Sequence, residues 1–272
     1  MGMLVLLCMG VAHAQPVRKV LVEAQLERPD ANKPVYIRGA LDRASESTGK
    51  VLLFYRGYPG IAQIEGADGQ VRFFNGQEHF EEMLPVFLNA GISTVTLDCP
   101  TDQQSACRDP YRSSQQHADD VRALIKVLRQ RGFSEFHLMG HSYGGVSSHW
   151  LALRLGEELK SVIHSATQSG SPPLFNADLA KSMKDFPHDA VKTETLYLHH
   201  QNDQCGLTPY SYAKATARSN RLVTVIGGDR SGPSCGAGSF HSYLGRRPQV
   251  ADALVRWVKD GEVVHVVKGP LD

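Results

Sequence analysis

The sequence predicts an α/β protein whose central sheet is mostly parallel and is covered by helices on both faces. Apolar segments with the character of buried strands alternate along the chain with segments of helical periodicity, and this alternation is typical of parallel sheets. Near the middle of the chain, one such strand runs into a Gly-x-Ser-x-Gly turn that a helix follows. A length of 272 residues suits one large domain of this class.

Two antiparallel strands are expected at the start of this domain, at 17–26 and 33–41. Both stretches are rich in β-forming residues, and a turn sequence separates them. The continuously apolar stretch 51–55 predicts a strand that is buried on both faces. A helix is expected at 77–90, where Pro85 either kinks the helix or marks its true start.

The remaining elements follow from the same patterns. Strands are expected at 92–97, 136–139, 161–165, 195–200 and 222–226, with an apolar tail at 263–267 that fits an added edge strand. Helices are expected at 114–131, 143–155, 209–218 and 248–260. The stretch 101–113 is predicted to be a polar loop. Residues 167–192 show little strand character and predict a short, partly helical cap rather than a full lid domain.

The first residues predict a secretory signal peptide. An apolar block at 4–11 is followed by Ala12-His13-Ala14, which fits cleavage after Ala14. This divides the chain into a signal peptide at 1–14 and a single exported domain at 15–272. No basic segment precedes the apolar block, so the signal is weak or the true start lies upstream. A lipoprotein signal through Cys8 and a disordered or strand-forming N-terminus are the alternatives.

Charge and hydropathy narrow the classes of partner. The formal net charge of +1 gives no reason to expect nucleic acid or an anionic membrane as a partner. No apolar run in the sequence is long enough to span a bilayer. The oligomeric state stays open, and the expected partner, a small-molecule acyl substrate, follows from the chemistry of the residues described next.

A nucleophile elbow is predicted at 140–144, where Gly-His-Ser-Tyr-Gly lies between a strand and a helix. Ser142 is expected at strained backbone angles, and glycines at 140 and 144 remove the collisions that side chains would cause in so tight a turn. The turn would place the Ser142 hydroxyl at the carboxyl end of the sheet. It would also place the Tyr143 N–H at a helix N-terminus, where the backbone dipoles favour negative charge.

A serine nucleophile needs a base and an orienting carboxylate, and both are found after predicted strands. Asp203 follows the strand at 195–200, and His241 lies on a Gly-rich loop before the last helix. Because the carboxyl ends of parallel strands share one edge of a sheet, Ser142, Asp203 and His241 can converge there. Asp98 and Asp229 are the competing acids. Among the competing histidines, His137, His164, His199 and His200 lie within strands, His117 and His149 on helices, and His141 in the elbow itself.

The loop Arg56-Gly57-Tyr58-Pro59-Gly60 is expected to supply the second donor of an oxyanion hole, because it is a Gly-rich turn after a central strand. We assign that donor to the Tyr58 N–H, beside the Tyr143 N–H. The alternative is an ordinary strand-to-helix loop.

Four cysteines remain after removal of the signal peptide, and three pairings are possible. We expect Cys99 to pair with Cys107, and Cys205 with Cys235. The second pair follows from the proposed site, because Cys205 lies beside Asp203 and Cys235 lies shortly before His241. That bridge would fix the acid loop against the histidine loop, and its reduction should loosen the site before it unfolds the core.

A metal site is the competing interpretation of His199, His200, Asp203 and Cys205. Their spacing matches no common site, and adjacent histidines of a strand point to opposite faces. No metal and no cofactor is therefore predicted.

These residues resemble the α/β-hydrolase superfamily, which has the α/β-hydrolase fold and the chain order Ser, Asp, His. The resemblance rests on 140–144, on 56–60, on Asp203 and on His241, and it covers roughly 51–260. More narrowly, His-His-Gln-Asn-Asp-Gln-Cys at 199–205 resembles a group of bacterial, often exported hydrolases whose substrates are not established. Many members carry histidine where this chain has Arg56, so the second donor can be Tyr58 or Gly57.

The resemblance implies a serine hydrolase, and the short cap favours carboxylic esters with small to medium acyl groups. Hydrolysis of amides or peptides by the same residues is the first alternative. A non-catalytic binding protein that keeps the scaffold is the second. Leu174, Phe175 and Phe186 are candidates for an apolar pocket, or pack in the core or on the surface.

Overall fold

A computed structural model describes residues 19–67, 70–72, 79–105, 107–169, 180–217 and 221–269. The predicted signal peptide with Cys8 lies outside the described residues, as do Leu174 and Phe175. Within the described ranges, no helix is long and apolar enough to cross a membrane.

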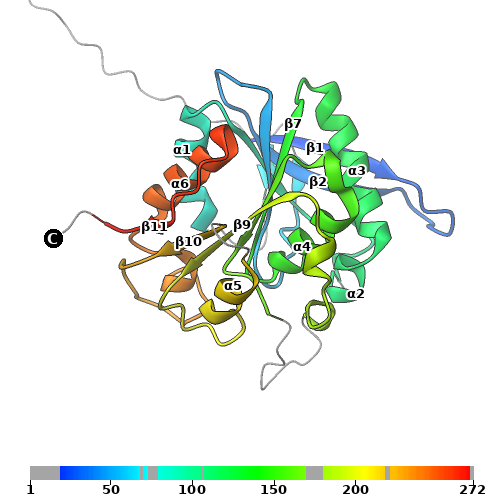
Figure 1. Cartoon of the computed structure of the whole chain (residues 1–272). Coiled ribbons are helices and arrows are strands. Elements are labelled where there is room, and N and C mark those ends of the chain that lie inside the picture. Colours follow the sequence, from blue (N-terminus) through cyan, green and yellow to red (C-terminus); the bar gives the residue numbers. More distant parts are fainter. Residues whose placement is uncertain are drawn as a thin grey trace, which may run out of the picture.

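A nine-stranded sheet forms the centre of the described chain (Figure 1). In spatial order its strands are β1 (Val20–Leu26), β2 (Val35–Asp42), β6 (Ser93–Leu97), β3 (Lys50–Tyr55), β7 (Glu135–His141), β8 (Ser161–Ser165), β9 (Glu194–His200), β10 (Leu222–Val225) and β11 (Val266–Val267). β1 pairs antiparallel with β2, and β2 with β6. The remaining neighbours are parallel. The predicted mostly parallel sheet with antiparallel N-terminal strands is confirmed, and the apolar tail does form an edge strand.

Helices cover both faces of this sheet (Figure 1). Their bounds are α1 Leu84–Asn89, α2 Asp109–Arg112, α3 Gln115–Gln130, α4 Gly144–Leu155, α5 Tyr210–Thr216 and α6 Arg247–Asp260. α3 and α4 pack on one face, and α1 and α6 on the other. The side chain of Ser114 caps α3 by accepting a hydrogen bond from the N–H of His117 at 3.2 Å.

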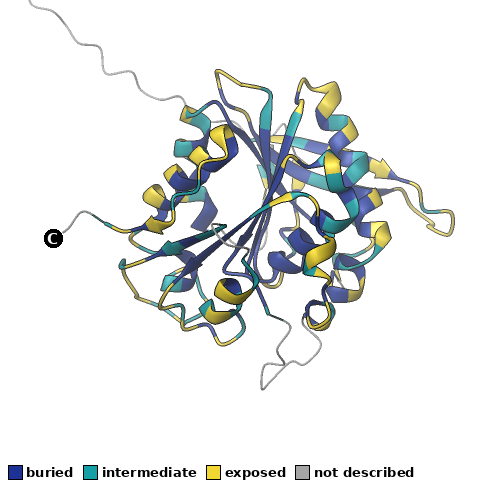
Figure 2. Cartoon of the chain, viewed as in Figure 1, coloured by how far each residue is buried: buried dark blue, intermediate teal, exposed yellow. Residues whose placement is uncertain are grey.

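The core is divided between the two faces of the sheet, and β3 shows why its sequence is continuously apolar. Val51, Leu53 and Tyr55 pack on the side of α3 and α4, whereas Leu52 and Phe54 pack on the side of α1 and α6. Side chains of a strand alternate between its faces, so a strand with helices on both sides needs apolar residues at every position. Figure 2 shows the buried strands between partly exposed helices.

Three regions of the chain differ from the sequence prediction. A small hairpin forms from β4 (Glu65–Ala67) and β5 (Gln70–Arg72), and α2 lies inside the predicted polar loop. Elements of three or four residues are too short to show a hydrophobic period. The helix expected at 77–90 is a 3₁₀ turn, His79–Glu82, followed by α1, and Pro85 lies in the first turn of α1. Proline fits there because the first N–H groups of a helix lack partners within it.

The described part of the predicted cap packs on α4. It contains two 3₁₀ turns, Lys181–Met183 and His188–Ala190. Phe186 contacts the rings of His149 and Trp150 edge to face, at centroid distances of 5.1 and 5.2 Å. Trp150 is only partly buried, and its indole N–H donates to the Ser182 hydroxyl at 2.8 Å. The apolar body of Trp150 therefore anchors this segment while its polar tip is satisfied.

Candidate active site

The pentapeptide at 140–144 forms a tight turn between β7 and α4. Ser142 has a φ of +54°, in the left-handed region that costs energy for a residue with a Cβ. A Cβ on Gly140 would lie 2.2 Å from the Gly144 carbonyl oxygen, and one on Gly144 would lie 2.3 Å from the Tyr55 carbonyl oxygen. Both distances are far below van der Waals contact, so glycine is required at both positions, as the sequence predicts. The Ser142 N–H donates to the Ser165 carbonyl at 2.9 Å, which holds the turn against β8.

The loop after β3 lies directly against this turn. A Cβ on Gly57 would be 3.2 Å from the Ser142 Cβ and 3.6 Å from its hydroxyl oxygen. Tyr58 extends outward with 64% of its surface exposed, and its ring centroid lies 6.1 Å from that of the buried Tyr143. Tyr143 immediately precedes α4. The backbone of 57–58 and the N-terminus of α4 therefore flank Ser142, where the sequence places the two oxyanion donors.

Asp203 and His241 lie at the same edge of the sheet and contact each other. Asp203 follows β9, and His241 lies in a 3₁₀ turn, Phe240–Ser242, after the loop that leaves β10. The distance from His241 Nδ1 to Asp203 Oδ2 is 2.9 Å. Since the carboxylate accepts, Nδ1 carries the hydrogen and Nε2 has a free lone pair. Nε2 is buried and has no hydrogen-bond partner within the described residues, so the Ser142 hydroxyl does not bond to it here.

The two competing acids occupy other environments. The Asp98 carboxylate accepts the N–H groups of Ala62, Ile64 and Cys99 at 2.8–2.9 Å, which makes it a support for the loop at 60–64. Asp229 is exposed. Of the three candidate acids, the geometry favours Asp203 as the partner of His241.

The neighbours of Asp203 keep it ionised. Burial alone would raise the pKa of its carboxyl group, but hydrogen bonds from His199 and His241 and from the Cys205 N–H hold that pKa well below its usual range. An ionised carboxylate at this place can stabilise a positive charge that develops on the His241 ring.

The side chain of His141, within the elbow, lies between two other histidine rings. Its ring centroid is 4.8 Å from that of His241 and 4.1 Å from that of His79. Its Nδ1 is 3.0 Å from the Ser165 hydroxyl. Complete burial, together with the nearby histidines, lowers the pKa of His141 well below its usual value. His141 is therefore neutral at physiological pH and packs beside His241 without adding a competing charge.

The residues of the alternative metal-site interpretation do not all point to one place. The Nε2 of His200 donates to the Gly227 carbonyl at 2.8 Å, whereas the Nε2 of His199 faces Asp203 and the Thr208 carbonyl. Cys205 is bonded to Cys235. The two histidines therefore point in different directions, as adjacent residues of a strand do.

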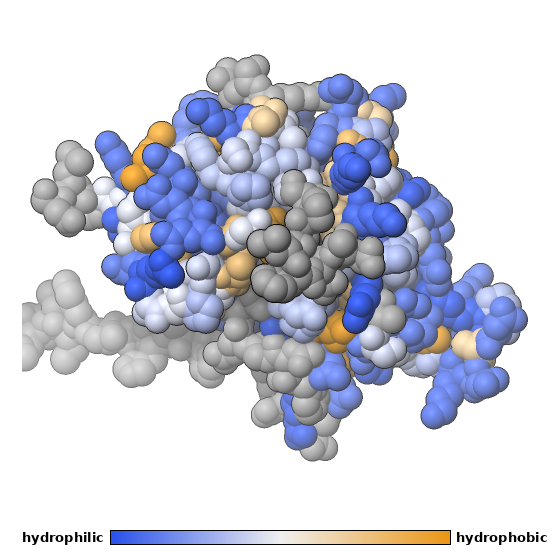
Figure 3. All heavy atoms as spheres, turned by 90° about the horizontal axis from the view of Figure 1, so that it is seen from below, coloured by the Kyte–Doolittle hydropathy of each residue, from blue (hydrophilic) through white to orange (hydrophobic). Residues whose placement is uncertain are grey.

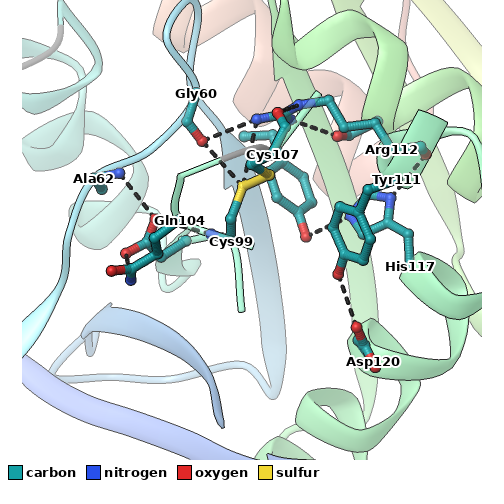
Figure 4. The surroundings of a disulfide bond; sticks show 12 residues. Gly60, Ala62, Cys99, Gln104, Cys107, Tyr111, Arg112, His117 and Asp120 are labelled. Carbon is teal, nitrogen blue, oxygen red and sulfur yellow. Dashed lines mark hydrogen bonds between the residues drawn. A yellow bond between two sulfur atoms is a disulfide. The ribbon is translucent and has the colours of Figure 1, made fainter. Parts of the chain in front are cut away.

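A buried arginine contacts the loop at 57–60 (Figure 4). Arg112 has no exposed surface; its guanidinium donates to the Gly60 carbonyl at 2.9 Å, to the Ser147 hydroxyl at 2.7 Å and to the Cys107 carbonyl at 3.0 Å. It also lies over the Tyr143 ring, 4.7 Å from the centroid. This one side chain thus joins the loop before the elbow to the helix after it.

Both expected cysteine pairs are at disulfide distance. Cys99 and Cys107 are 6.1 Å apart between Cα atoms and both are buried, next to Arg112 (Figure 4). Cys205 and Cys235 are 4.7 Å apart between Cα atoms, and Cys235 is exposed. The second bridge connects the Asp203 loop to the His241 loop, 30 residues later in the chain.

The Cys205–Cys235 bridge is expected to be reduced before the Cys99–Cys107 bridge. Thiol–disulfide exchange requires access to a sulfur atom, and only the first pair includes an exposed cysteine. A graded reductant series should open Cys205–Cys235 first and lower hydrolytic activity while the near-UV circular dichroism of the core is kept. The double variant Cys205→Ser/Cys235→Ser should reproduce the activity loss. The buried pair, as Cys99→Ser/Cys107→Ser, is the matched control and should instead lower the unfolding midpoint. Simultaneous loss of activity and core signal throughout the series would contradict this order.

Figure 3 views the molecule from the side on which β7 and β9 end. Hydrophilic side chains dominate this face, and smaller hydrophobic areas lie near its centre.

Comparison with known proteins identifies the class. Residues 50–257 match the family model described as the α/β-hydrolase fold. The chain therefore belongs to the α/β-hydrolase family and is a hydrolase of that class.

The individual proteins that this chain resembles share only part of its length or a low sequence identity with it. A 2-hydroxy-6-oxononadienedioate/2-hydroxy-6-oxononatrienedioate hydrolase from Burkholderia vietnamiensis is 30% identical over 101 residues, which cover 37% of this chain and 34% of that protein. The match thus spans about a third of that relative. Est1E from Butyrivibrio proteoclasticus superposes with a TM-score of 0.56 at 13% identity, covering 90% of this chain and 97% of that one. A dienelactone hydrolase from Anabaena variabilis gives a TM-score of 0.58 at 16% identity, covering 88% and 97%. These superpositions show the shared fold.

Three residues at the site escape the sequence prediction. Arg112 falls in the stretch taken as a polar loop, His199 is expected to be a core histidine, and Thr208 is expected to precede a helix. Arg112 and Thr208 matter through contacts with residues 33 to 52 positions away, and His199 through the fold of the loop at 203–208; no local sequence pattern shows these contacts.

Proposed function

We propose that this protein is a serine hydrolase that cleaves carboxylic esters with small to medium acyl groups. Ser142 is the proposed nucleophile, His241 the base and Asp203 the orienting acid. The observation that carries the proposal is the contact of 2.9 Å between His241 Nδ1 and Asp203 Oδ2, at the edge of the sheet where the strained turn presents Ser142. No cofactor is needed for this chemistry.

The reaction would proceed in two halves. The Ser142 oxygen attacks the ester carbonyl carbon while its proton passes to His241 Nε2, and the tetrahedral intermediate expels the alcohol, which takes that proton. Water then attacks the acyl-enzyme, again giving a proton to His241, and the acid leaves as Ser142 regains its hydrogen. Catalytic hydrogen bonds are often loose before substrate binds, so a rotation of the Ser142 side chain would complete the contact with Nε2.

The negative oxygen of each intermediate would be stabilised by backbone N–H groups. The Tyr143 N–H at the start of α4 is one proposed donor, and the N–H of Tyr58, or that of its neighbour Gly57, is the second. Loss of one such donor typically costs about 10²–10³ in rate. The position of Gly57 against Ser142 supports this assignment.

The preference for esters is supported by a fold neighbour that is by name a lactone hydrolase, since a lactone is a cyclic ester. The remaining choice, between esters and amides, depends on the cap and the pocket. We propose that residues 167–192 form that short cap within a single domain. A panel of acyl esters of graded length beside aminoacyl amides separates the two chemistries.

We propose that the mature protein works outside the cytoplasm. Two disulfides in the chain support an oxidising compartment, because such bonds are rare where glutathione and thioredoxin keep thiols reduced. The short apolar segment at the N-terminus supports the same location.

A fluorophosphonate probe tests the proposal directly. The purified mature protein should form a covalent adduct on Ser142, found by mass spectrometry, and should hydrolyse short acyl esters. Ser142→Ala should lose both. Ser211→Ala, which changes an exposed serine of α5, is the matched control and should still be labelled. Absence of an adduct on the wild-type protein, with ester turnover equal to that of Ser142→Ala, would refute the proposal and favour a binding protein.

A further inference from the structure

The Asp203 carboxylate accepts more hydrogen bonds than the pairing with His241 requires. Its Oδ2 lies 2.9 Å from His241 Nδ1, 3.0 Å from the Thr208 hydroxyl and 3.1 Å from His199 Nε2. Its Oδ1 accepts the Cys205 N–H at 2.8 Å. The side chains of His199 and Thr208 have no exposed surface, so water does not compete with them for the carboxylate.

The hydrogen of the His199 ring is fixed by its surroundings. Nε2 faces two acceptors, Asp203 Oδ2 at 3.1 Å and the Thr208 carbonyl at 2.9 Å. The other nitrogen, Nδ1, is buried and has no hydrogen-bond partner in the part of the chain that the structure describes. The hydrogen therefore lies on Nε2, and His199 shares it between the Asp203 carboxylate and the Thr208 carbonyl.

Thr208 links the acid to the base as well. Its hydroxyl oxygen is 3.0 Å from Asp203 Oδ2 and 3.1 Å from His241 Nδ1. A hydroxyl can donate one hydrogen and accept others, so it donates to the carboxylate and accepts a share of the Nδ1 hydrogen. The Thr208 N–H donates to the Cys205 carbonyl at 3.0 Å, which holds the loop at 203–208 closed.

We propose that His199 and Thr208 are positioning residues for the acid and the base of this hydrolase, an inference that rests on the proposed function. With both donors in place, Oδ2 is held toward His241 and Oδ1 toward the Cys205 N–H, and the carboxylate cannot turn away. The His241 ring is held at the same time by Thr208. Neither residue touches the substrate; each acts by keeping His241 Nε2 directed at the place where the Ser142 proton is released.

This arrangement matters most when charge develops. As His241 takes the Ser142 proton, the ring becomes positive and needs the carboxylate at hydrogen-bond distance. A carboxylate that is fixed in advance requires no reorganisation at that moment, which is the physical basis of electrostatic preorganisation. Loss of one fixed donor should therefore slow the chemical step more than it weakens substrate binding.

Two matched pairs of variants test the inference. His199→Leu and Thr208→Val remove the donor, whereas His199→Gln and Thr208→Ser keep one at nearly the same place. For a short acyl ester, His199→Leu and Thr208→Val should each lower kcat by about 10- to 100-fold, in line with the loss of a hydrogen bond to a charged group, with KM changed less than about threefold. His199→Gln and Thr208→Ser should recover kcat to within about fivefold of wild type. Thermal unfolding of each variant reports whether it is folded.

A merely structural role gives a different pattern. In that case kcat would fall only in proportion to the folded fraction of each variant. His199→Gln and Thr208→Ser would then have no higher kcat than His199→Leu and Thr208→Val of the same stability. Retention of kcat within threefold in folded Thr208→Val and His199→Leu would overturn the inference, as would equal losses in both members of each pair. Thr208→Val is nearly isosteric and keeps the test valid if His199→Leu fails to fold. Failure of the proposed function is distinguished by the wild-type protein, which would then neither label at Ser142 nor hydrolyse esters.

Discussion

Replacement of His241 by glutamine is expected to lower kcat for ester hydrolysis by about 10⁴- to 10⁶-fold, as losses of the catalytic base do in serine hydrolases. The amide of glutamine can still donate toward Asp203, but it cannot take the proton of Ser142. The fold should tolerate the change, because glutamine can fill much of the space of the buried ring. Initial-rate kinetics on a short acyl ester measure the loss, and the fluorophosphonate reaction should slow in parallel.

The matched control is His265→Gln, which changes an exposed histidine beside β11 and should leave kcat and KM unchanged. A kcat for His241→Gln within tenfold of wild type, measured on protein with an unchanged unfolding midpoint, would assign the base to another residue. His141, whose ring is 4.8 Å from that of His241, would then be the next candidate to replace.

Replacement of Arg112 by methionine is expected to lower the free energy of unfolding by about 3 kcal/mol or more, because it leaves buried carbonyls without donors. The Gly60 and Cys107 carbonyls would each lose a donor that lies about 3 Å away. The loop at 57–60 would also lose its connection to α4, so kcat should fall beyond what instability explains. Urea unfolding and ester kinetics on the folded fraction measure the two effects separately.

Arg108→Met is the control for this variant, since Arg108 is an exposed arginine at the start of the same short helix. It should change the unfolding free energy by less than about 0.5 kcal/mol, as surface substitutions usually do. The loss of unfolding free energy in Arg112→Lys should lie between the losses in Arg108→Met and Arg112→Met, because an ammonium group cannot reach all three acceptors of a planar guanidinium. An Arg112→Met protein as stable and active as wild type would remove the proposed link between the loop and the elbow.

Local steric rules explain why much of the fold was predictable from the sequence. The turn around Ser142 needs glycine at 140 and 144 whatever the rest of the chain does, so its signal is complete within five residues. The buried strand at β3 is continuously apolar because helices cover both of its faces. The positions of Ser142, Asp203 and His241 after strands likewise predict that these residues lie at one edge of the sheet, because the carboxyl ends of parallel strands meet there.

What the sequence could not predict depends on contacts between distant segments. Arg112 lies in a short helix without a hydrophobic period, and its partners are 52, 35 and 5 residues away. That His199 and His200 point to opposite faces follows from strand geometry, but which of the two faces Asp203 depends on the fold of the loop after β9. Whether Pro85 kinks a helix or begins one was equally open, because both outcomes satisfy the constraints on proline.

The edge strand β11 has a practical meaning for handling this protein. The N–H groups of Thr224 and Ile226 donate to the carbonyls of His265 and Val267 at 2.9 and 2.8 Å, so the tail shields the outer side of β10. Truncation before His265 would leave those donors open to pairing with a second molecule, on the strand that leads into the loop carrying His241. Expression designs should therefore keep the tail through Lys268. A C-terminal affinity tag should follow this tail and should not replace it.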